Sequence, residues 1–255
     1  MNNGPSQFLR RARIALTPRS TLLRTRLQNG ALVEGYNRPG YGGRGVYVYR
    51  DSLEPELNCL QHFLRDGDVF VDVGANVGVF SMKAAKEVGN KGVVIAIEPF
   101  IETALRLTRN AQANGFSNVR VRNFCIGRTT RHERLHLNKG KPNSFSLVPN
   151  GNVDSISVLS VSLDDLSRWE NLGRLDYLKI DAEGTEAAVL EGGEATIRRF
   201  RPIVQVEVTI RDSRLGLNYR RFSAPESMNN VFIPTENSKA IATALNLGWV
   251  ETSAA

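Results

Sequence analysis

The sequence predicts a doubly wound α/β fold, with a mostly parallel sheet that is covered by helices on both faces. The first observation is that short, continuous apolar runs, such as residues 69–73 and 93–97, alternate with segments whose apolar residues recur at helical spacing. Such runs are typical of parallel strands that are buried on both faces. The second observation is that a glycine-containing turn, residues 74–78, joins the first run directly to a helical segment. This strand–turn–helix arrangement is typical of α/β folds that bind a nucleoside.

The remaining elements follow from the same patterns. The apolar runs predict strands at residues 46–49, 69–73, 93–97, 119–124, 175–180 and 203–208. Helical spacing predicts helices at about residues 55–65, 78–88 and 185–200, and one that Pro99 opens. Glycine, proline and polar clusters predict a turn-rich segment at 30–45, a long loop at 138–157 and an irregular region at 211–239.

Length and composition indicate one α/β domain with a modest extension. The chain has 255 residues, of which 41% are hydrophobic and 23% are charged. It contains no run of about 20 apolar residues, so we expect no transmembrane segment. It also lacks the apolar core of a signal peptide. Because Cys59 and Cys125 lie far apart and outside any CxxC pattern, we expect reduced thiols and a cytoplasmic protein.

The positive charge is concentrated at one end of the chain. Residues 1–50 contain nine arginines and one acid, Glu34, which gives a net charge of +8. Since the whole chain carries +7, residues 51–255 carry −1. We therefore expect residues 1–50 to form a basic, turn-rich extension of residues 51–255, which form the domain. The extension is interpreted as a solvated tail, with contact to phosphates or to an anionic membrane surface as the alternative.

The turn after the first buried strand is the predicted cofactor site. Gly74 permits a tight turn with positive φ, and Gly78 lets the backbone approach a ligand closely. The helix that follows offers unpaired N–H groups to an anionic group. The predicted binding residues of this turn are Asp72, Gly74, Ala75, Asn76 and Gly78.

Glu98 is the second part of the predicted cofactor site. It ends the next strand, 26 residues after Asp72, close to where an acid binds ribose hydroxyls in such folds. An acid at this point favours an unphosphorylated ribose. A dinucleotide-binding oxidoreductase is the rival interpretation, but it expects GxGxxG. The turn here reads Gly-Ala-Asn-Val-Gly-Val and lacks the second glycine of that motif.

Several motifs together resemble the FkbM family of methyltransferases. The stretches that carry the resemblance are residues 72–81, Glu98-Pro99, 162–166, 178–186 and 201–207, and the similarity extends over about residues 54–250. The resemblance implies a class I methyltransferase (Rossmann-like) fold with S-adenosyl-L-methionine as cofactor. It adds Pro99 to the predicted binding residues. It also implies methyl transfer to a hydroxyl of a sugar, glycan or secondary metabolite, and hence a small-molecule or glycan acceptor.

Asp181 and Glu183 are the predicted catalytic residues, because they follow the fourth apolar strand of the main sheet at its ligand-binding edge. Methyl transfer to an alcohol requires the hydroxyl to be oriented and its proton to be removed. Either carboxylate could serve as general base or as orienting acceptor. Helix capping is the structural alternative for acids at this point. A metal held by Asp181 and Glu207 is a less favoured hypothesis, and no metal is predicted.

Two further patterns each have a functional and a structural interpretation. His132-Glu-Arg-Leu-His136 matches the HExxH zinc motif, but the surrounding alternation predicts a strand, on which the two histidines lie about 13 Å apart. Arginines in the 211–239 region could line a pocket for an anionic or carbohydrate acceptor, or belong to a solvated insertion; they are Arg211, Arg214, Arg220 and Arg221.

Two other functions remain as alternatives. An RNA methyltransferase could use the arginine-rich extension, although the near-neutral domain disfavours a nucleic-acid partner. The sequence after the fourth strand, Asp181-Ala-Glu-Gly, also lacks the proline-aromatic motif of base-modifying amino-methyltransferases. The second alternative is a non-catalytic binding module of the same fold, because a fold does not prove an activity.

Overall fold

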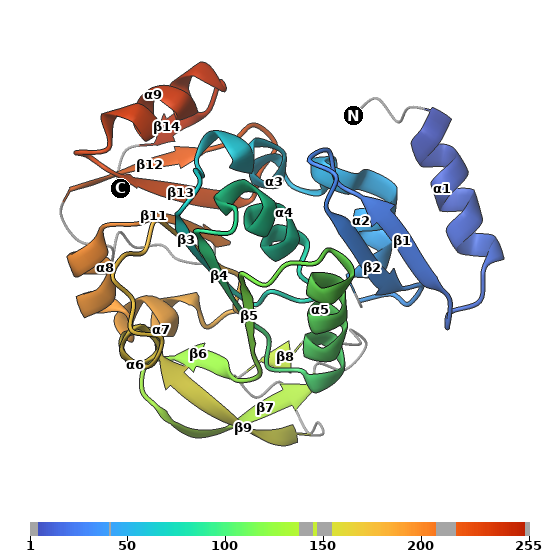
Figure 1. The fold of residues 1–255 in the computed structure, drawn as a ribbon, viewed down its shortest axis with the longest axis horizontal. Helices are drawn as coiled ribbons and strands as arrows, with labels where there is room; N and C mark the ends of the chain where they lie inside the picture. The colour runs from blue at the N-terminus through green and yellow to red at the C-terminus, as the bar shows by residue number, and fades with distance from the viewer. Residues whose placement is uncertain (1–4, 41, 138–144, 147–154, 208–217, 253–255) are drawn as a thin grey trace.

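The computed structural model describes residues 5–40, 42–137, 145–146, 155–207 and 218–252, and an eight-stranded sheet forms its centre (Figure 1). Five neighbouring strands are parallel, and three antiparallel strands continue the sheet at one edge. The parallel strands, in spatial order, are β11 (Ile203–Glu207), β10 (Tyr177–Ile180), β3 (Val69–Val73), β4 (Val93–Ile97) and β5 (Val119–Arg122). The antiparallel strands are β13 (Asn229–Pro234), β12 (Tyr219–Ser223) and β14 (Val250–Thr252). The predicted fold class, a mostly parallel α/β sheet, is confirmed.

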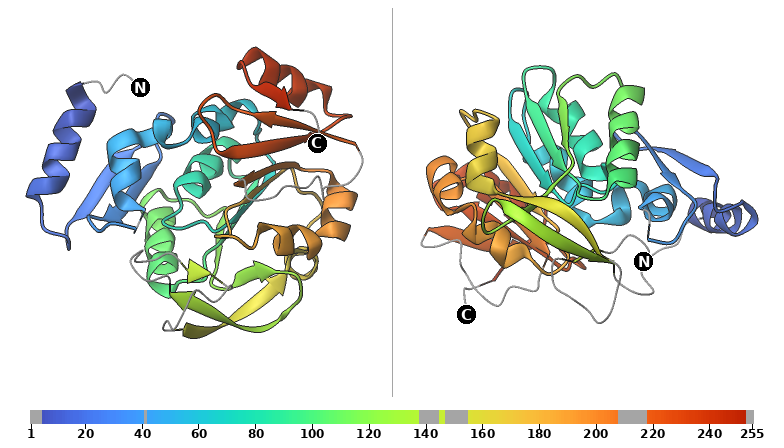
Figure 2. Two further views of the ribbon diagram at one scale, coloured as in Figure 1. Left: turned by 180° about the vertical axis from the view of Figure 1, so that it is seen from behind. Right: turned by 90° about the horizontal axis from the view of Figure 1, so that it is seen from below.

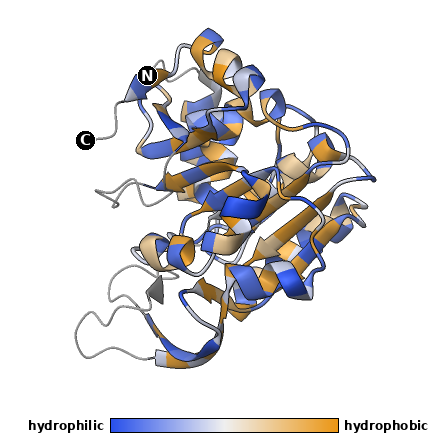
Figure 3. Ribbon diagram, turned by 90° about the vertical axis from the view of Figure 1, so that its left-hand side faces the viewer, coloured by the Kyte–Doolittle hydropathy of each residue, from blue (hydrophilic) through white to orange (hydrophobic). Residues whose placement is uncertain are grey.

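Helices cover both faces of this sheet, and each face has its own apolar core. Phe70 of β3 belongs to one core and its neighbour Val71 to the other, as expected when successive side chains of a strand point in opposite directions. The first core is covered by α3 (Pro55–Cys59), α4 (Val79–Val88), α5 (Ile101–Ala113) and α9 (Ser238–Asn246). The second is covered by α6 (Leu163–Trp169), α7 (Glu186–Glu191) and α8 (Glu194–Phe200). The apolar strands lie between the helical layers in Figure 3.

A smaller sheet follows β5 and contains the HExxH segment. Its strands, in spatial order, are β6 (Cys125–Gly127), β9 (Ser155–Ser162), β7 (Arg131–Leu137) and β8 (Phe145–Ser146). His132 and His136 lie on β7, opposite Leu159 and Ser155 of β9. The predicted strand is therefore confirmed. Within the described ranges no group of three or more His, Cys, Asp or Glu residues is arranged to hold a metal ion.

Several predictions about elements were wrong. Residues 30–45, expected to be turn-rich, contain a strand at Leu32–Tyr36, and the helix predicted at 55–65 is α-helical only over Pro55–Cys59. Residues 46–49 belong to α2 (Gly43–Tyr49), a helix that buries Gly43, Val46 and Val48, and not to a strand. The helix predicted at 185–200 is two helices, because the chain turns at Gly192 and Gly193 between α7 and α8. The region 211–239, expected to be irregular, contains β12, β13 and the start of α9. In the part of residues 138–157 that the structure describes, β8 and the start of β9 are regular, and the rest of that predicted loop lies outside the described residues.

Much of the basic segment expected to be a solvated tail is folded. It forms α1 (Pro5–Leu16) and a hairpin of β1 (Leu22–Arg26) and β2 (Leu32–Tyr36), beside α2 (Figures 1 and 2). The hairpin is joined to α5 by side-chain amides: Asn110 and Asn114 each exchange two hydrogen bonds with the backbone of β2. The division into an extension and a domain at residue 50 stays a prediction. Among the described helices, none has the length and apolar character needed to span a bilayer.

A buried ion pair joins this segment to α4. Lys83 Nζ lies 2.6 Å from Asp51 Oδ1, and both side chains are at most 2% exposed. The second carboxylate oxygen of Asp51 accepts the Gln28 backbone N–H at 2.7 Å. Because the charges are removed from water, each depends on the other for compensation.

Replacing Asp51 with alanine leaves the Lys83 ammonium buried without its partner. We expect the Asp51→Ala variant to lose about 3–5 kcal/mol in its free energy of unfolding, as measured by chemical denaturation. The exposed pair Lys91–Asp66 gives the matched control. Asp66→Ala should change the free energy of unfolding by less than about 1 kcal/mol. Equal losses in the two variants would contradict this account of the buried pair.

Candidate active site

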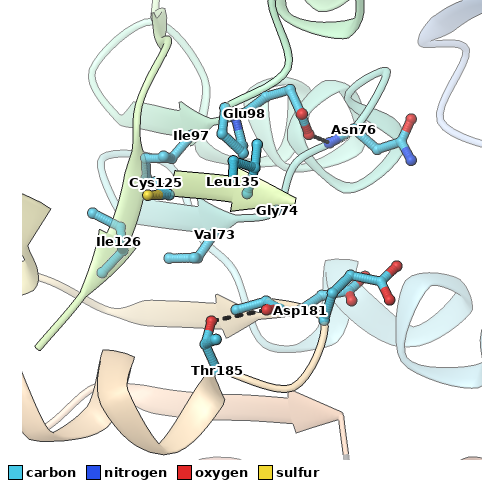
Figure 4. Close-up of a pocket in the computed structure, with 13 residues that line it drawn as sticks. Val73, Gly74, Asn76, Ile97, Glu98, Cys125, Ile126, Leu135, Asp181 and Thr185 are labelled. Atoms are coloured by element: carbon cyan, nitrogen blue, oxygen red, sulfur yellow. Dashed lines mark hydrogen bonds between the residues drawn. The ribbon is translucent and has the colours of Figure 1, made fainter. Parts of the chain in front are cut away.

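A pocket opens at the carboxyl edge of β3, β4 and β10, where ligands of parallel sheets bind (Figure 4). It contains about 660 Å³ of space that no atom occupies, including the part open to solvent. The residues that line it are Val73, Gly74, Asn76, Ile97, Glu98, Pro99, Cys125, Ile126, Leu135, Asp181, Ala182, Glu183 and Thr185.

The turn after β3 is held between the ends of its two neighbouring strands. The backbone N–H groups of Gly74 and Ala75 both donate to the carbonyl of Ile97, at 3.0 and 2.9 Å. Gly74 has a φ of +74°, and a Cβ added there would lie 1.9 Å from the Asp181 carbonyl oxygen. Any side chain at this position would therefore force the turn away from the end of β10.

Glu98 fixes the other side of the pocket. Its two carboxylate oxygens accept the backbone N–H groups of Asn76 and Phe100, each at 2.9 Å (Figure 4). Burial raises the pKa of Glu98 to about 7, although these two hydrogen bonds favour the ionised form. A carboxylate oxygen has more than one lone pair, so Glu98 can also accept hydrogen bonds from a ligand in the pocket.

Apolar side chains beside Glu98 form one wall of the pocket (Figure 4). Ile97 comes from the end of β4, while Cys125, Ile126 and Leu135 come from the smaller sheet. Burial raises the pKa of the Cys125 thiol to about 11, so this side chain contributes apolar surface and not a thiolate. Apolar side chains beside a carboxylate suit a nucleoside, whose base packs against apolar surface and whose ribose offers hydroxyl donors.

A second cavity lies on the far side of Asp181. It contains about 760 Å³ of open space, again including solvent, at the ends of β10 and β11. The residues that line it are Leu53, Glu54, Pro55, Lys179, Ile180, Asp181, Gln205, Glu207, Glu226, Ser227, Met228 and Asn229. Asp181 lines both cavities, so a ligand in either one can reach it.

A buried lysine lies beneath Asp181. Lys179 Nζ is 3.4 Å from Asp181 Oδ2 and 3.5 Å from Asp72 Oδ1, and its side chain is 5% exposed. Burial opposes the charged form, but Asp181, Asp72 and Glu54 outweigh it and raise the pKa of Lys179. Lys179 is therefore a fixed cation at the junction of the two cavities.

Glu207 is the acidic neighbour of Asp181 on the next strand. Ile180 is paired with Val206 in the parallel register, so the residues that follow them are also adjacent. Burial raises the pKa of Glu207 to about 7, and the charge of Asp181 and a hydrogen bond with it add to this effect. Near neutral pH, Glu207 is therefore protonated in part of the molecules.

The loop from β10 to α7 is braced by Glu186. Its Oε1 accepts the backbone N–H groups of Ala182 and Gly184, at 3.1 and 3.0 Å. Glu183, between them, has a φ of +50° and an exposed side chain. Glu186 thus holds the loop that precedes α7, and it does not cap the first turn of that helix.

The structure brings together most of the residues predicted from the sequence. Six of them line the first pocket: Gly74, Asn76, Glu98, Pro99, Asp181 and Glu183. Asp72, Ala75 and Gly78 do not line it. Asp72 is fully buried and accepts a hydrogen bond from Ser81 at 2.6 Å, while a Cβ at Gly78 would lie 2.9 Å from Leu107. Asp72 and Gly78 therefore support the strand and the helix around the pocket.

The pocket residues from the smaller sheet, and most residues of the second cavity, were not predicted from the sequence. Cys125, Ile126 and Leu135 are brought to the pocket by chain topology, and no local motif marks them. Gln205 and Glu207 lie on a strand that was predicted, but Gln205 was not considered as a site residue. Its polar side chain within an apolar run was the one available signal.

Comparison with known proteins gives one family match. The model of the methyltransferase FkbM domain matches residues 72–228, more than half of the chain. No curated protein matches it.

Similar solved structures share a low percentage of identical residues with the chain. The FkbM methyltransferase from Methylobacillus flagellatus KT is 20% identical, with a TM-score of 0.41; the alignment covers 64% of this chain and 42% of that one. An S-adenosylmethionine-dependent methyltransferase from Aquifex aeolicus is 16% identical over 78% and 81% of the two chains, with a TM-score of 0.38. Aeropyrum pernix fibrillarin, with natively bound S-adenosyl-L-methionine, is 12% identical over 83% and 96%, with a TM-score of 0.42.

The family match confirms the predicted resemblance, the class of enzyme and S-adenosyl-L-methionine as its cofactor. The chain spans 42% of the length of the FkbM methyltransferase from Methylobacillus flagellatus KT. On the match over residues 72–228, the chain belongs to the FkbM family of methyltransferases.

Proposed function

We propose that the chain transfers the methyl group of S-adenosylmethionine to a hydroxyl of a neutral sugar, glycan or related polyhydroxy metabolite. The observation that carries this proposal is the position of Asp181, which lines both the pocket beside Glu98 and the acidic second cavity. A side chain that contacts both the methyl donor and the acceptor can align the two for methyl transfer.

The first pocket suits the cofactor by the chemistry of its residues. Glu98 can accept hydrogen bonds from the ribose hydroxyls, and the apolar wall of Ile97, Ile126 and Leu135 can pack against the adenine. Asp181 and Glu183 supply carboxylates for the positively charged end of the cofactor. When bound, S-adenosylmethionine supplies a methyl group that is activated by a positively charged sulfur.

Asp181 is the proposed general base. The acceptor hydroxyl would donate a hydrogen bond to the Asp181 carboxylate, which would orient the oxygen and take its proton. The new C–O bond would form as the bond between the methyl carbon and sulfur breaks and leaves the neutral thioether. Lys179 holds this carboxylate in position from below. Glu183 lines the first pocket but not the second, so it is the weaker candidate for contact with an acceptor.

The charges of the second cavity favour a neutral acceptor that is rich in hydroxyl groups. Among the residues that the structure describes, four acids line it against one cation, Lys179; the acids are Glu54, Asp181, Glu207 and Glu226. An acceptor with phosphate or carboxylate groups would be repelled here. The Gln205 side chain is 1% exposed, and its amide nitrogen makes no hydrogen bond with any residue that the structure describes, so it is available to donate to an acceptor oxygen.

The arginines that could have bound an anionic acceptor do not line the second cavity, as far as the structure describes them. Arg220 pairs with Glu251 at 2.6 Å, and Arg221 donates to Thr252 at 2.6 Å; neither lines the second cavity. Arg211 and Arg214 lie outside the described residues. This arrangement supports a neutral acceptor over an anionic one.

The test of the proposal is transfer of isotope-labelled methyl from S-adenosylmethionine. Purified protein is incubated with neutral oligosaccharides, with their phosphorylated counterparts and with total RNA. Label in the neutral oligosaccharides supports the proposal. Label in RNA alone would favour the RNA methyltransferase alternative. Cofactor binding without transfer to any acceptor would favour the non-catalytic alternative.

The affinity for S-adenosylmethionine should depend on the ionisation of Glu98. The ribose hydroxyls donate to its carboxylate, so the ionised form binds better, and this form increases as pH rises through about 7. We expect the Kd measured by isothermal titration to be up to about tenfold lower at pH 8 than at pH 6, since the ionised fraction changes by that factor.

The control for this pH dependence is Glu98→Gln, which cannot ionise. We expect this variant to bind more weakly than wild type at pH 8 and to show no comparable change in Kd between the two pH values. A wild-type Kd that stays constant across this range, or the same pH dependence in Glu98→Gln, would contradict the assignment of Glu98 to the ribose.

Asp181→Asn should remove the general base and leave the fold intact. We expect kcat to fall by about 10²- to 10⁴-fold, the usual contribution of a positioned base, while the Kd for S-adenosylmethionine changes by less than about tenfold. Glu183→Gln should lower kcat less than Asp181→Asn does. Steady-state kinetics with the labelled methyl assay gives kcat, and isothermal titration gives the Kd.

Glu102→Gln is the matched control for these carboxylate substitutions, because Glu102 is exposed in the first turn of α5. We expect wild-type kcat for it. If Glu183→Gln abolished transfer and Asp181→Asn retained it, the roles given to the two acids would be wrong.

A further inference from the structure

The helix α1 turns an apolar face away from the rest of the protein. Phe8, Leu9 and Leu16 are 70%, 67% and 86% exposed. Together with the exposed Ala12 and Ala15 they lie at the spacings that gather side chains on one face of a helix. Helix α1 lies at one edge of the molecule, on the outer side of the hairpin (Figures 1 and 2). Exposed apolar side chains gathered in one place mark a surface that binds something.

The opposite face of α1 is fixed to the protein. Arg10 donates hydrogen bonds to the carbonyls of Tyr47 and Val48, at 3.4 and 3.3 Å. Asn37, which is fully buried, donates to the carbonyls of Ile14 and Thr17, both at 2.9 Å. Because these contacts determine the rotation of the helix about its axis, the apolar face cannot turn inward while they remain.

Arginines border the apolar face on both sides. Helical geometry puts Arg11 on one flank and Arg13 on the other, and both residues are exposed. The Arg11 guanidinium also donates to the Tyr49 hydroxyl and lies over the Tyr49 ring. Neither arginine forms an ion pair with an acid in the part of the chain that the structure describes. The one acid in residues 1–50, Glu34, is paired with Arg24 and Arg106. The surroundings of the apolar face are therefore strongly positive.

We propose that α1 lies flat on an anionic lipid surface, with the apolar face of Phe8, Leu9, Ala12, Ala15 and Leu16 inserted between the headgroups. The flanking guanidinium groups contact the lipid phosphates. An apolar face with basic borders is the pattern of helices that bind in the plane of a membrane interface. Binding requires both features, because a face of this size gives weak attachment without the attraction to anionic lipid.

The charge pattern favours lipid over two other occupants. In a twofold pair of two copies, the arginines on the borders of the two α1 helices would be brought together and would repel. A nucleic acid would engage the arginines, but it would leave Phe8, Leu9 and Leu16 without an apolar partner.

The experiment measures binding of the full chain to vesicles by co-sedimentation. One set of vesicles is phosphatidylcholine alone, and the other contains one quarter phosphatidylglycerol. We expect partitioning to the anionic vesicles to be at least about tenfold stronger, since each arginine near the surface contributes roughly fivefold. The double variant Leu9→Asp/Leu16→Asp should lose about tenfold or more, and Arg13→Gln about fivefold.

The matched control is Leu245→Asp on α9, where an exposed leucine of similar type lies outside the proposed surface. We expect it to bind vesicles as wild type does. Circular dichroism and cofactor titration show whether each variant remains folded. Equal binding to both kinds of vesicle, no loss in the double variant, or an equal loss in Leu245→Asp would overturn the proposal. So would a dimer in sedimentation that the double variant abolishes, or RNA binding without vesicle binding.

Discussion

The contact between the β3–α4 turn and the end of β10 is the constraint on which the site depends. Gly74 approaches the Asp181 carbonyl so closely that a Cβ would lie 1.9 Å from the oxygen. The same turn is held to β4 by hydrogen bonds to the Ile97 carbonyl and from Asn76 to Glu98. One short turn therefore sets the distance between the Glu98 side of the first pocket and its Asp181 side, and it does so through backbone atoms.

Charge at this edge is organised around one buried cation. Lys179 lies between Asp72 and Asp181, and Glu54 adds to the negative potential around it. On the far side, Glu207 shares a hydrogen bond with Asp181 and has a pKa raised to about 7 by burial and by that neighbour. The second cavity is therefore acidic although the chain as a whole is basic, and the positive charge of residues 1–50 lies on a different surface. The proposed catalytic site and the proposed lipid-binding face of α1 thus lie on different parts of the molecule.

The sequence predicted the parallel core well, because buried parallel strands leave a local signature. The ranges 69–73 and 93–97 agree with β3 and β4. Predictions failed where tertiary contacts override local pattern. Alternating valine and tyrosine at 46–49 favours a strand, yet α2 is helical and buries Gly43 against the backbone of β2. The break at Gly192 has a similar cause, since a Cβ there would lie 2.2 Å from the Gly127 carbonyl oxygen. Glu98 and Asp181 follow strands and were found; Leu135 and Gln205 reach the cavities through topology and register, which no short motif encodes.

The central claim is that the pocket beside Glu98 holds the methyl donor with its reactive sulfur facing Asp181. A crystal structure of the protein with S-adenosylhomocysteine tests it most directly. We expect the ribose hydroxyls within hydrogen-bond distance of Glu98, the adenine against Ile97 and Ile126, and the sulfur next to Asp181 and open toward the second cavity. A ligand bound elsewhere, or one whose sulfur is closed off from that cavity, would contradict it.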